Sequence, residues 1–437
     1  MKKIAYLMLC ISLITFSCKK ERKIQIHQVT VQLAYPTGSQ FSVTADVLVK
    51  MKGNGTSFEA KTDASGKAVF SVPTDIYEVS ASDIRSAAGK AFIYNALTTG
   101  VTVIDTHDPA EVIKLNLEES KTSQLIIKEV YIGGVPTDNG SGTFVYDGYV
   151  TIYNNSDYPA NTGNLCIGAI GPLNAHATNN FYGTDGKLIY ENQGWIPAVS
   201  GFWFFQENVI IEPRKQLVVA LYNAVDNTKT HSKSINFDNR DYYVTYDIAG
   251  QYKNANYYVP PVASIPTSHY LKSVTYATGN AWTPSVITPG IILFETKGTT
   301  PAAFGAEASS TVVVQLASKK LPVDWVVDGV ESFNLESTAN KKRFLPTVDA
   351  GYVLHTNRLG YSIYRNVDEA ATKAIAGNEA KLVKNYQNGT VNVGGTTDPS
   401  GIDAEASIKN GATIIYKDTN NSSNDMHLRA KAALRTN

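Results

Sequence analysis

Apolar and polar residues alternate with a period of two near the start of the chain, from Ile24-Gln25-Ile26 to Leu33. This period places successive side chains on opposite faces of a strand, so one face of the strand is expected to be buried. Six further segments are read as short strands: residues 43–50, 58–62, 67–73, 77–81, 91–95 and 111–117. Seven short strands at regular spacing predict a small β-sandwich over residues 24–118.

A charged link over residues 118–123 ends this pattern, and a second set of strands follows it. The strands predicted beyond the link are residues 124–131 and 148–157. Alanine, Glu and Lys content predicts a short helix within residues 367–384, weakened by Gly377, and residues 302–304 after Pro301 are expected to start another helical turn. The chain is therefore predicted to be all-β, with a larger β-domain at residues 124–437 and short helical decorations.

One segment of the first domain resembles a known module. Residues 62–70 read Thr-Asp-Ala-Ser-Gly-Lys-Ala-Val-Phe, and Tyr77-Glu78-Val79 follows. This pattern resembles the hairpin and strand of carboxypeptidase regulatory-like, prealbumin-like domains. The resemblance covers residues 24–118 and implies a spacer near an anchor. It brings no catalytic residues with it.

The second domain resembles another family. Residues 124–131 and 148–157 are similar to the opening of the lamin-tail domain, an immunoglobulin-like sandwich found in many bacterial surface proteins. Later segments resemble its motifs in order: residues 211–220, 322–330, 360–365 and 418–425. Thr151 stands where that family has a glutamate, and an aromatic-rich insertion at about residues 160–290 exceeds a plain lamin-tail domain. The order of modules resembles Bacteroidetes lipoproteins of uncharacterised function, which implies a fold and a location but no activity.

The N-terminus has the pattern of a secretory signal. Lys2-Lys3 precedes an apolar or small-residue run that ends at Ser17. This run is shorter than the roughly 20 apolar residues of a transmembrane helix. Thr15-Phe16-Ser17-Cys18 resembles a bacterial lipobox, with Thr15 in the place of the preferred leucine. We expect a signal peptide at residues 1–17 and a lipidated Cys18; an ordinary signal peptide that leaves a soluble secreted protein is the alternative.

A lipid anchor implies attachment to the outer membrane through a polar tether at residues 18–23. The tether begins with Lys19-Lys20 and lacks the acidic tract that follows the cysteine in many surface-exposed relatives. The periplasmic and the cell-surface face of the membrane therefore both stay open.

Charge and cysteine content narrow the function classes. The 39 Lys and Arg residues equal the 39 Asp and Glu residues, so no net field favours nucleic acid as a partner. Cys10 leaves with the signal and Cys18 would carry lipid, which leaves Cys166 without a cysteine partner. Since residues 164–168 read as a strand, we expect Cys166 to be a small buried hydrophobe.

Catalytic and metal signatures are missing from the sequence. It contains no zinc signature, nucleophile elbow, phosphate loop or dinucleotide fingerprint. We therefore expect a non-enzymatic protein without a cofactor or metal, although carboxylates distant in sequence leave paired-carboxylate catalysis open. Residues 418–425, Asp-Thr-Asn-Asn-Ser-Ser-Asn-Asp, offer oxygens to Ca²⁺ but lack the glycine and glutamate of a calcium loop, which favours a turn.

Aromatic residues are dense in the insertion, where Asn, Asp and Gln lie among them. Such a mixture supplies apolar faces beside hydrogen-bonding groups, as in binding pockets. The predicted ligand-binding residues are Tyr242, Tyr243, Tyr246, Tyr257, Tyr258 and Trp282. The alternative is that these rings pack in the core.

Two functions follow from these expectations. In the first, the protein is a binding lipoprotein for a small molecule or glycan, associated with a TonB-dependent outer-membrane nutrient receptor. In the second, it is a structural or adhesive cell-surface lipoprotein whose insertion is buried.

Overall fold

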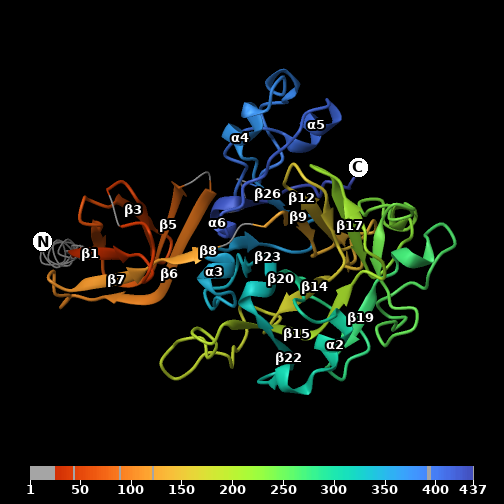
Figure 1. Cartoon of the computed structure of the whole chain (residues 1–437), viewed down its shortest axis with the longest axis horizontal. Coiled ribbons are helices and arrows are strands. Elements are labelled where there is room, and N and C mark those ends of the chain that lie inside the picture. The colour runs from red at the N-terminus through yellow and green to blue at the C-terminus, as the bar shows by residue number, and fades with distance from the viewer. Residues whose placement is uncertain (1–24, 43–44, 88–89, 121–122, 391–394, 437) are drawn as a thin grey trace, which may run out of the picture. The chain divides into compact units, whose positions relative to one another are not determined.

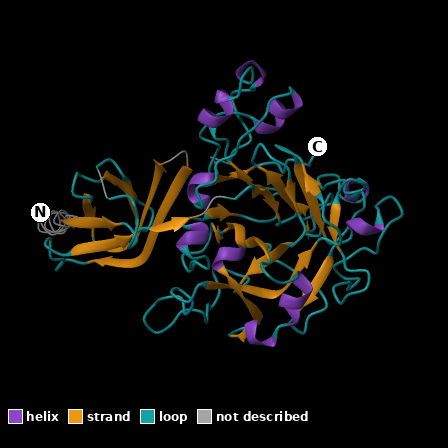
Figure 2. Ribbon diagram, in the orientation of Figure 1, coloured by secondary structure: helices purple, strands orange, loops and turns teal. Residues whose placement is uncertain are grey.

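The computed structural model describes residues 25–42, 45–87, 90–120, 123–390 and 395–436. Strands make up most of the regular structure, and the helices are short (Figure 2). The predicted all-β class with helical decorations is confirmed. The signal segment, Cys18 and the tether lie outside the described residues.

The described chain divides into two compact units. The smaller comprises the described residues of 1–34, 42–81 and 98–115, and the larger comprises residues 35–41, 82–97 and 116–437. Two long strands, β5 (Asp75–Ala87) and β6 (Lys90–Val103), contribute to both units. The predicted domain boundary at residues 118–123 stays a prediction.

Two sheets form the N-terminal part of the chain (Figure 1). The first has the order β4 (Lys67–Pro73), β1 (Ile26–Ala34) and β7 (Val112–Asn116). The second has the order β3 (Ser57–Lys61), β2 (Leu48–Lys52), β5, β6 and β8 (Glu118–Ser120). Alternate residues of β1 and β4 are buried, as their period of two predicts.

In this part of the chain the strand limits differ most from the prediction at β2, β5 and β6. β2 begins at Leu48 rather than at residue 43, because Asp46 has a φ of 73°, a turn conformation that ends an extended run. β5 and β6 continue well beyond the predicted residues 77–81 and 91–95.

Two large sheets form the larger unit. The six-stranded sheet has the order β18 (Tyr243–Thr245), β17 (Gln216–Leu221), β12 (Tyr149–Asn154), β9 (Leu125–Tyr131), β26 (Ser362–Arg365) and β27 (Met426–Arg429). The seven-stranded sheet has the order β21 (Thr311–Val313), β22 (Ala317–Pro322), β15 (Trp195–Phe204), β14 (Leu165–Ile170), β20 (Ile291–Glu295) and β23 (Val326–Val330), and β19 (Lys272–Thr275) also pairs with β15.

Three short two-stranded sheets complete the strands. They pair β10 (Val135–Pro136) with β11 (Thr143–Phe144), β13 (Ala160–Asn161) with β16 (Ile210–Ile211), and β24 (Ser332–Asn334) with β25 (Val353–His355). The segment predicted as an insertion, about residues 160–290, therefore supplies strands to both large sheets.

The main core lies between the two large sheets. Leu125 and Ile127 of β9 share a buried cluster with Leu165 and Ile167 of β14. Ile126 of β9 points to the opposite face, where the segment around Ile402 and Ile414 covers it. Because both faces of the central strands are covered, β9, β12 and β14 are buried along their full length instead of alternating. Cys166 of β14 is fully buried, as predicted.

The helices lie outside the strand layers (Figure 2). The α-helices are α2 (Pro301–Ala306), α3 (Pro346–Asp349), α4 (Glu369–Ala374), α5 (Ala404–Lys409) and α6 (Ser422–Asp425). The 3-10 turns are η1 (Asn227–Lys229), η2 (Thr267–His269), η3 (Ala308–Ser310), η4 (Val323–Trp325) and η5 (Glu379–Lys381). Within the described residues, no helix combines the length and apolar content that membrane crossing requires.

Both helix predictions can be compared with these elements. α2 begins at Pro301 and includes the turn predicted at residues 302–304, and the Thr300 side chain caps it by accepting a hydrogen bond from the Ala303 N–H. The helix predicted within residues 367–384 is present only as α4 and the later turn η5. Gly377 has a φ of 69° between them, so the chain leaves the helical conformation there.

Candidate functional site

The structure places most of the predicted ligand-binding residues in the core. Tyr243, Tyr246, Tyr258 and Trp282 are all at most 9% exposed and belong to the cluster between the two large sheets. Tyr257 is partly buried against the same cluster. Tyr242 is partly buried against a separate cluster on the outer face of the six-stranded sheet.

Tyr258 and Tyr243 also make specific contacts inside the protein. The Tyr258 hydroxyl accepts a hydrogen bond from the Trp282 backbone N–H at 2.9 Å. The Tyr243 ring stacks on His269 with 4.2 Å between ring centroids. A ligand would reach the four buried rings only after the core opened, so their positions support packing. The binding role of the six residues stays a prediction, and the site described next is made of other residues.

A cavity of about 330 Å³ lies in the larger unit, at one end of β23. Six parts of the fold contribute to its lining: β8, the turn before β15, η4, β23, α3 and the loop before α6. In the same order, the lining residues are Glu119; Gly194; Val323 and Asp324; Val326 and Val327; Thr347 and Val348; and Asn420. Val348 and Asn420 are buried, whereas Glu119, Gly194 and Asp324 are exposed. The cavity therefore has a buried floor with an apolar part and a solvent-accessible, acidic rim.

Two other cavities have less favourable linings. One is a polar depression formed by a single surface loop, residues 183–193. The other, about 210 Å³, lies between the Pro172–Phe181 region and the turn at Gln315–Leu316. The cavity at β23 combines several elements of the fold with both apolar and polar groups, which is the usual composition of a ligand site.

Buried charges hold one wall of the cavity in place. Asp328, which follows Val327 in β23, binds the Arg365 guanidinium of β26. The Asp328 carboxylate also accepts a hydrogen bond from the Ile127 N–H at 2.6 Å. The same guanidinium donates to the backbone carbonyls of Ile127 and Lys417 at 2.8 and 2.9 Å. These contacts connect β23, β9 and β26.

The Arg365 guanidinium lies near two further carboxylates, those of Asp418 and Asp425, at 3.4 and 3.9 Å. Asp425 accepts hydrogen bonds from the Thr419 N–H and hydroxyl, both at 2.7 Å. Three carboxylates thus surround one cation; Arg365, Asp328 and Asp425 are buried, and the Asp418 side chain is 9% exposed. Burial raises the pKa of each of the three carboxyl groups, partly offset by Arg365.

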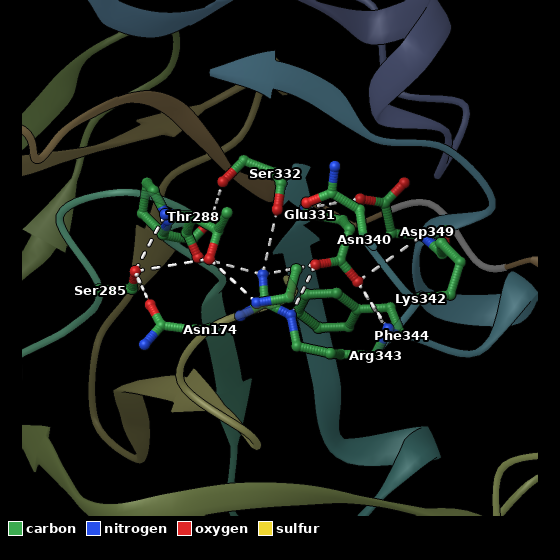
Figure 3. Close-up of polar contacts among 12 residues, drawn as sticks. Asn174, Ser285, Thr288, Glu331, Ser332, Asn340, Lys342, Arg343, Phe344 and Asp349 are labelled. Carbon is green, nitrogen blue, oxygen red and sulfur yellow. Dashed lines mark hydrogen bonds and ion pairs between the residues drawn. The ribbon is translucent and has the colours of Figure 1, made fainter. Parts of the chain in front are cut away.

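A second buried network joins the residue after β23 to the segment before α3 (Figure 3). Glu331 and Arg343 are both fully buried, and the Arg343 Nε donates to the Glu331 carboxylate at 2.8 Å. The Arg343 guanidinium also donates to the carbonyls of Leu173 and Thr288 at 2.7 and 3.1 Å. Since a buried ion pair is stable only when its hydrogen bonds are satisfied, this arrangement fixes the segment that leads into α3.

Asp349, at the end of α3, links the two networks. Its carboxylate accepts hydrogen bonds from the Ser422 N–H at 2.7 Å and from the Ser422 hydroxyl at 2.5 Å. The Ala350 N–H donates to the Asn420 carbonyl at 2.8 Å, while Asn420 has a φ of 52°. The loop that carries Asn420 is therefore pinned to α3 on one side and to Arg365 on the other. The cavity lining is preorganised by side chains that do not themselves line it.

The rim of the cavity carries negative charge. Glu119 and Asp324 are its two charged lining residues among those described. Lys297 approaches Asp324 at 3.5 Å, at an exposed position. Beside Glu119, burial and the Glu191 carboxylate raise the pKa of Glu118. The rim thus contains more acidic than basic side chains.

No group of three or more potential metal ligands is present among the described residues. The carboxylates of residues 418–425 bind Arg365 and backbone N–H groups instead. The interpretation of this segment as a turn agrees with its Asn hydrogen bonds, for example from the Ser423 N–H to Asn421 Oδ1 at 3.1 Å. It did not anticipate that Asp425 is buried.

Three segments identified in the sequence meet at this site. Residues 322–330 line the cavity, residues 360–365 supply Arg365, and residues 418–425 supply two carboxylates and Asn420. The sequence did not indicate that they lie together. Glu331, Arg343 and Asp349 had no sequence signal beyond their charge.

Comparison with known proteins gives one family match and one structural match. Residues 212–379 match the model of a protein family of unknown function, DUF4876. A search of curated proteins finds no significant match. The crystal structure of a DUF4876 family protein from Bacteroides thetaiotaomicron VPI-5482 is similar in fold, with 19% sequence identity and a TM-score of 0.51 over 92% of this chain and 94% of that chain.

Proposed function

We propose that this chain is a binding protein of the bacterial cell envelope, held to the outer membrane by lipid on Cys18, and that it captures a small ligand in the cavity at β23. One observation carries the binding role, namely a cavity with a partly apolar, buried floor and polar groups at its rim. Its volume of about 330 Å³ falls in the range of small-molecule sites, roughly 300–1,000 Å³.

The construction of the walls supports the same function. A binding site gains affinity when its residues are held in place before the ligand arrives, because less conformational entropy is lost on binding. The networks around Arg365 and Arg343 supply such support from behind the lining. By analogy with lipoproteins that hand ligands to membrane receptors, the partner proposed for this chain is a TonB-dependent nutrient receptor.

The test is a ligand screen with a variant that fills the cavity. Thr347→Trp places a large ring in the lining, and Thr230→Trp makes the same change at an exposed position. A panel of alkylamines, oligosaccharides, short peptides and fatty acids is added to each purified chain, and Tm is measured by calorimetry. A ligand at about 100 times its Kd stabilises the folded state by about 2.7 kcal/mol, which raises Tm by several degrees.

The expected result is a compound that raises the Tm of the wild type and of Thr230→Trp but leaves Thr347→Trp unchanged. A panel without effect on the wild type would reject small-molecule binding. Equal stabilisation of all three chains would place the ligand elsewhere.

A structural or adhesive role is the second candidate, because the aromatic residues of the segment at about 160–290 are largely buried. This role requires adhesion to a surface without a soluble ligand. Binding of the intact chain to immobilised matrix components, unchanged in Thr347→Trp, would favour it.

A further inference from the structure

The charges in and around the cavity narrow the class of its ligand, on the premise that the cavity binds one. Among the described lining residues, Glu119 and Asp324 are acidic and none is basic. A pocket lined by one sign of charge concentrates ligands of the opposite sign. The exposed Lys297 offsets part of the Asp324 charge from outside the lining.

The residues behind the lining add to this imbalance. The two networks contain five carboxylates, from Asp328, Asp418, Asp425, Asp349 and Glu331, and three cationic side chains, from Arg365, Lys342 and Arg343. Negative charge in this poorly solvated region also affects the pKa of Asp418. Burial raises that pKa to about 7, and the nearby Asp328 and Asp425 carboxylates raise it further. A positive charge in the cavity would lower this electrostatic cost.

The apolar part of the lining indicates what carries that charge. Four valines line the cavity, at positions 323, 326, 327 and 348. A hydrated metal ion would gain nothing from contact with valine side chains, and metal ions of this kind prefer several converging oxygens. A hydrocarbon stem gains roughly 25 cal/mol for each Å² of apolar surface that it buries.

We propose that the ligand carries a primary ammonium group on a short apolar stem. The stem lies against the valines, and the ammonium group lies at the rim near Glu119 and Asp324. An ammonium group has three donors and no acceptor, which matches a lining whose charged groups are all acceptors. Thr347 and Asn420 add polar side chains to the same lining. A free alkylamine and the lysine side chain of a peptide share this chemistry.

The test compares three probes of one chain length, hexylamine, 1-hexanol and hexanoate, by calorimetric titration of the full chain. Hexylamine is expected to bind at least about tenfold more tightly than the alcohol, which corresponds to about 1.4 kcal/mol, and hexanoate more weakly than either. Added salt is expected to weaken the binding of hexylamine and to leave that of hexanol unchanged.

A charge-removing pair of substitutions locates the effect. The double variant Glu119→Gln with Asp324→Asn is expected to lose the preference for the amine while it still binds hexanol. Glu336→Gln with Asp105→Asn removes the same charges from exposed positions outside the lining and is expected to behave as the wild type. A lysine-bearing peptide with a blocked N-terminus, titrated in parallel, separates the two sources: weaker binding than hexylamine indicates the free amine, and tighter binding indicates the peptide.

Two results would overturn the proposal, and they can be told apart. If hexanol binds as tightly as hexylamine and Thr347→Trp abolishes both, the cavity binds ligands but the cationic class is wrong. If no probe and no compound of the wider panel binds the wild type, the binding function itself fails.

Discussion

Lowering the pH is expected to destabilise the larger unit through His427. The imidazole is buried on β27, where its Nε2 accepts a hydrogen bond from the Tyr386 hydroxyl at 2.7 Å. Its Nδ1 lies 2.7 Å from the Asn366 Oδ1, an acceptor, since the Asn366 amide nitrogen donates to the Asn424 carbonyl. The network therefore holds the neutral ring with its proton on Nδ1.

The size of the effect follows from the pKa. Burial, aided by the Arg429 charge, lowers the pKa of His427 from 6.5 to about 3. Below pH 6.5 the unfolded chain takes up a proton here that the folded chain does not take up until about pH 3. Stability is therefore lost as the pH falls through this window, and the loss between pH 7 and 5 is about 2 kcal/mol for this residue.

Other buried groups contribute to the same pH range. Burial lowers the pKa of His355 to about 4, which adds a loss of the same sign. Burial raises the pKa of Asp147 to about 6, which acts in the opposite direction. In a comparison of two chains that differ only at position 427, the contributions of His355 and Asp147 to the pH dependence are the same in both chains and cancel.

The assay is urea unfolding at pH 7 and pH 5, followed by tryptophan fluorescence. All four tryptophans, at positions 195, 203, 282 and 325, lie in the larger unit, so the signal reports its unfolding. His427→Gln keeps a donor for Asn366 and an acceptor for Tyr386 without a titrating ring. Its loss of stability between the two pH values is expected to be about 2 kcal/mol smaller than that of the wild type.

His231→Gln makes the same substitution at a half-buried position in the larger unit and is expected to retain the wild-type dependence. An equal loss in His427→Gln and the wild type would show that His427 is charged in the folded state. The assignment of a neutral ring would then be wrong.

Four further outcomes are expected. Arg343→Met removes the cation that is hydrogen-bonded to the buried Glu331, leaving only Lys342 at 3.8 Å, and should cost about 3–5 kcal/mol in urea unfolding, whereas Arg240→Met at an exposed position should cost about 0.5 kcal/mol or less. The Cys166 thiol, whose pKa burial raises, should resist a thiol reagent until urea unfolds the chain; rapid labelling of the native protein would contradict its burial. Asp147→Asn should remove a stability loss of about 2 kcal/mol that otherwise develops as the pH rises from 4 to 6, because the folded chain holds the Asp147 proton more tightly than the unfolded chain; unchanged curves would refute this. Mass spectrometry of the membrane fraction should find acylated Cys18, and recovery of wild type and Cys18→Ala alike as soluble, unmodified protein would contradict it.

Local patterns in the sequence were sufficient for many individual strands. β4 occupies the predicted residues 67–73, because apolar side chains at every second position are a direct signature of one buried face. The helical turn near Pro301 and the interruption of the later helix at Gly377 could likewise be predicted, since each depends on one residue and its immediate neighbours.

The cavity at β23 and its supporting charges could not be predicted from local sequence patterns. Arg365 and Ile127 are 238 residues apart, and nothing in either local segment shows that they are hydrogen-bonded. Charged residues usually face water, so the sequence did not predict that Asp328 and Asp425 are buried. The cavity exists because of these distant pairings.

For the aromatic residues, composition alone did not distinguish a binding surface from a core. Tyrosine combines a large apolar face with a polar tip, so the same composition suits a binding surface and a core. For Tyr258 the hydrogen bond with the Trp282 backbone satisfies the hydroxyl inside the protein. Composition contains no information about whether such a partner is available.

The position of β27 in the six-stranded sheet has a consequence for the order of events during folding. The sheet is completed by residues Met426–Arg429, and residues 418–425 supply two of the carboxylates around Arg365. A chain made from its N-terminus exposes β9 and β12, which are buried on both faces in the folded protein, long before these residues have been synthesised. Pairing over such separations is slow. The six-stranded sheet is therefore expected to stay open and sensitive to proteases until residues 418–429 have paired with it.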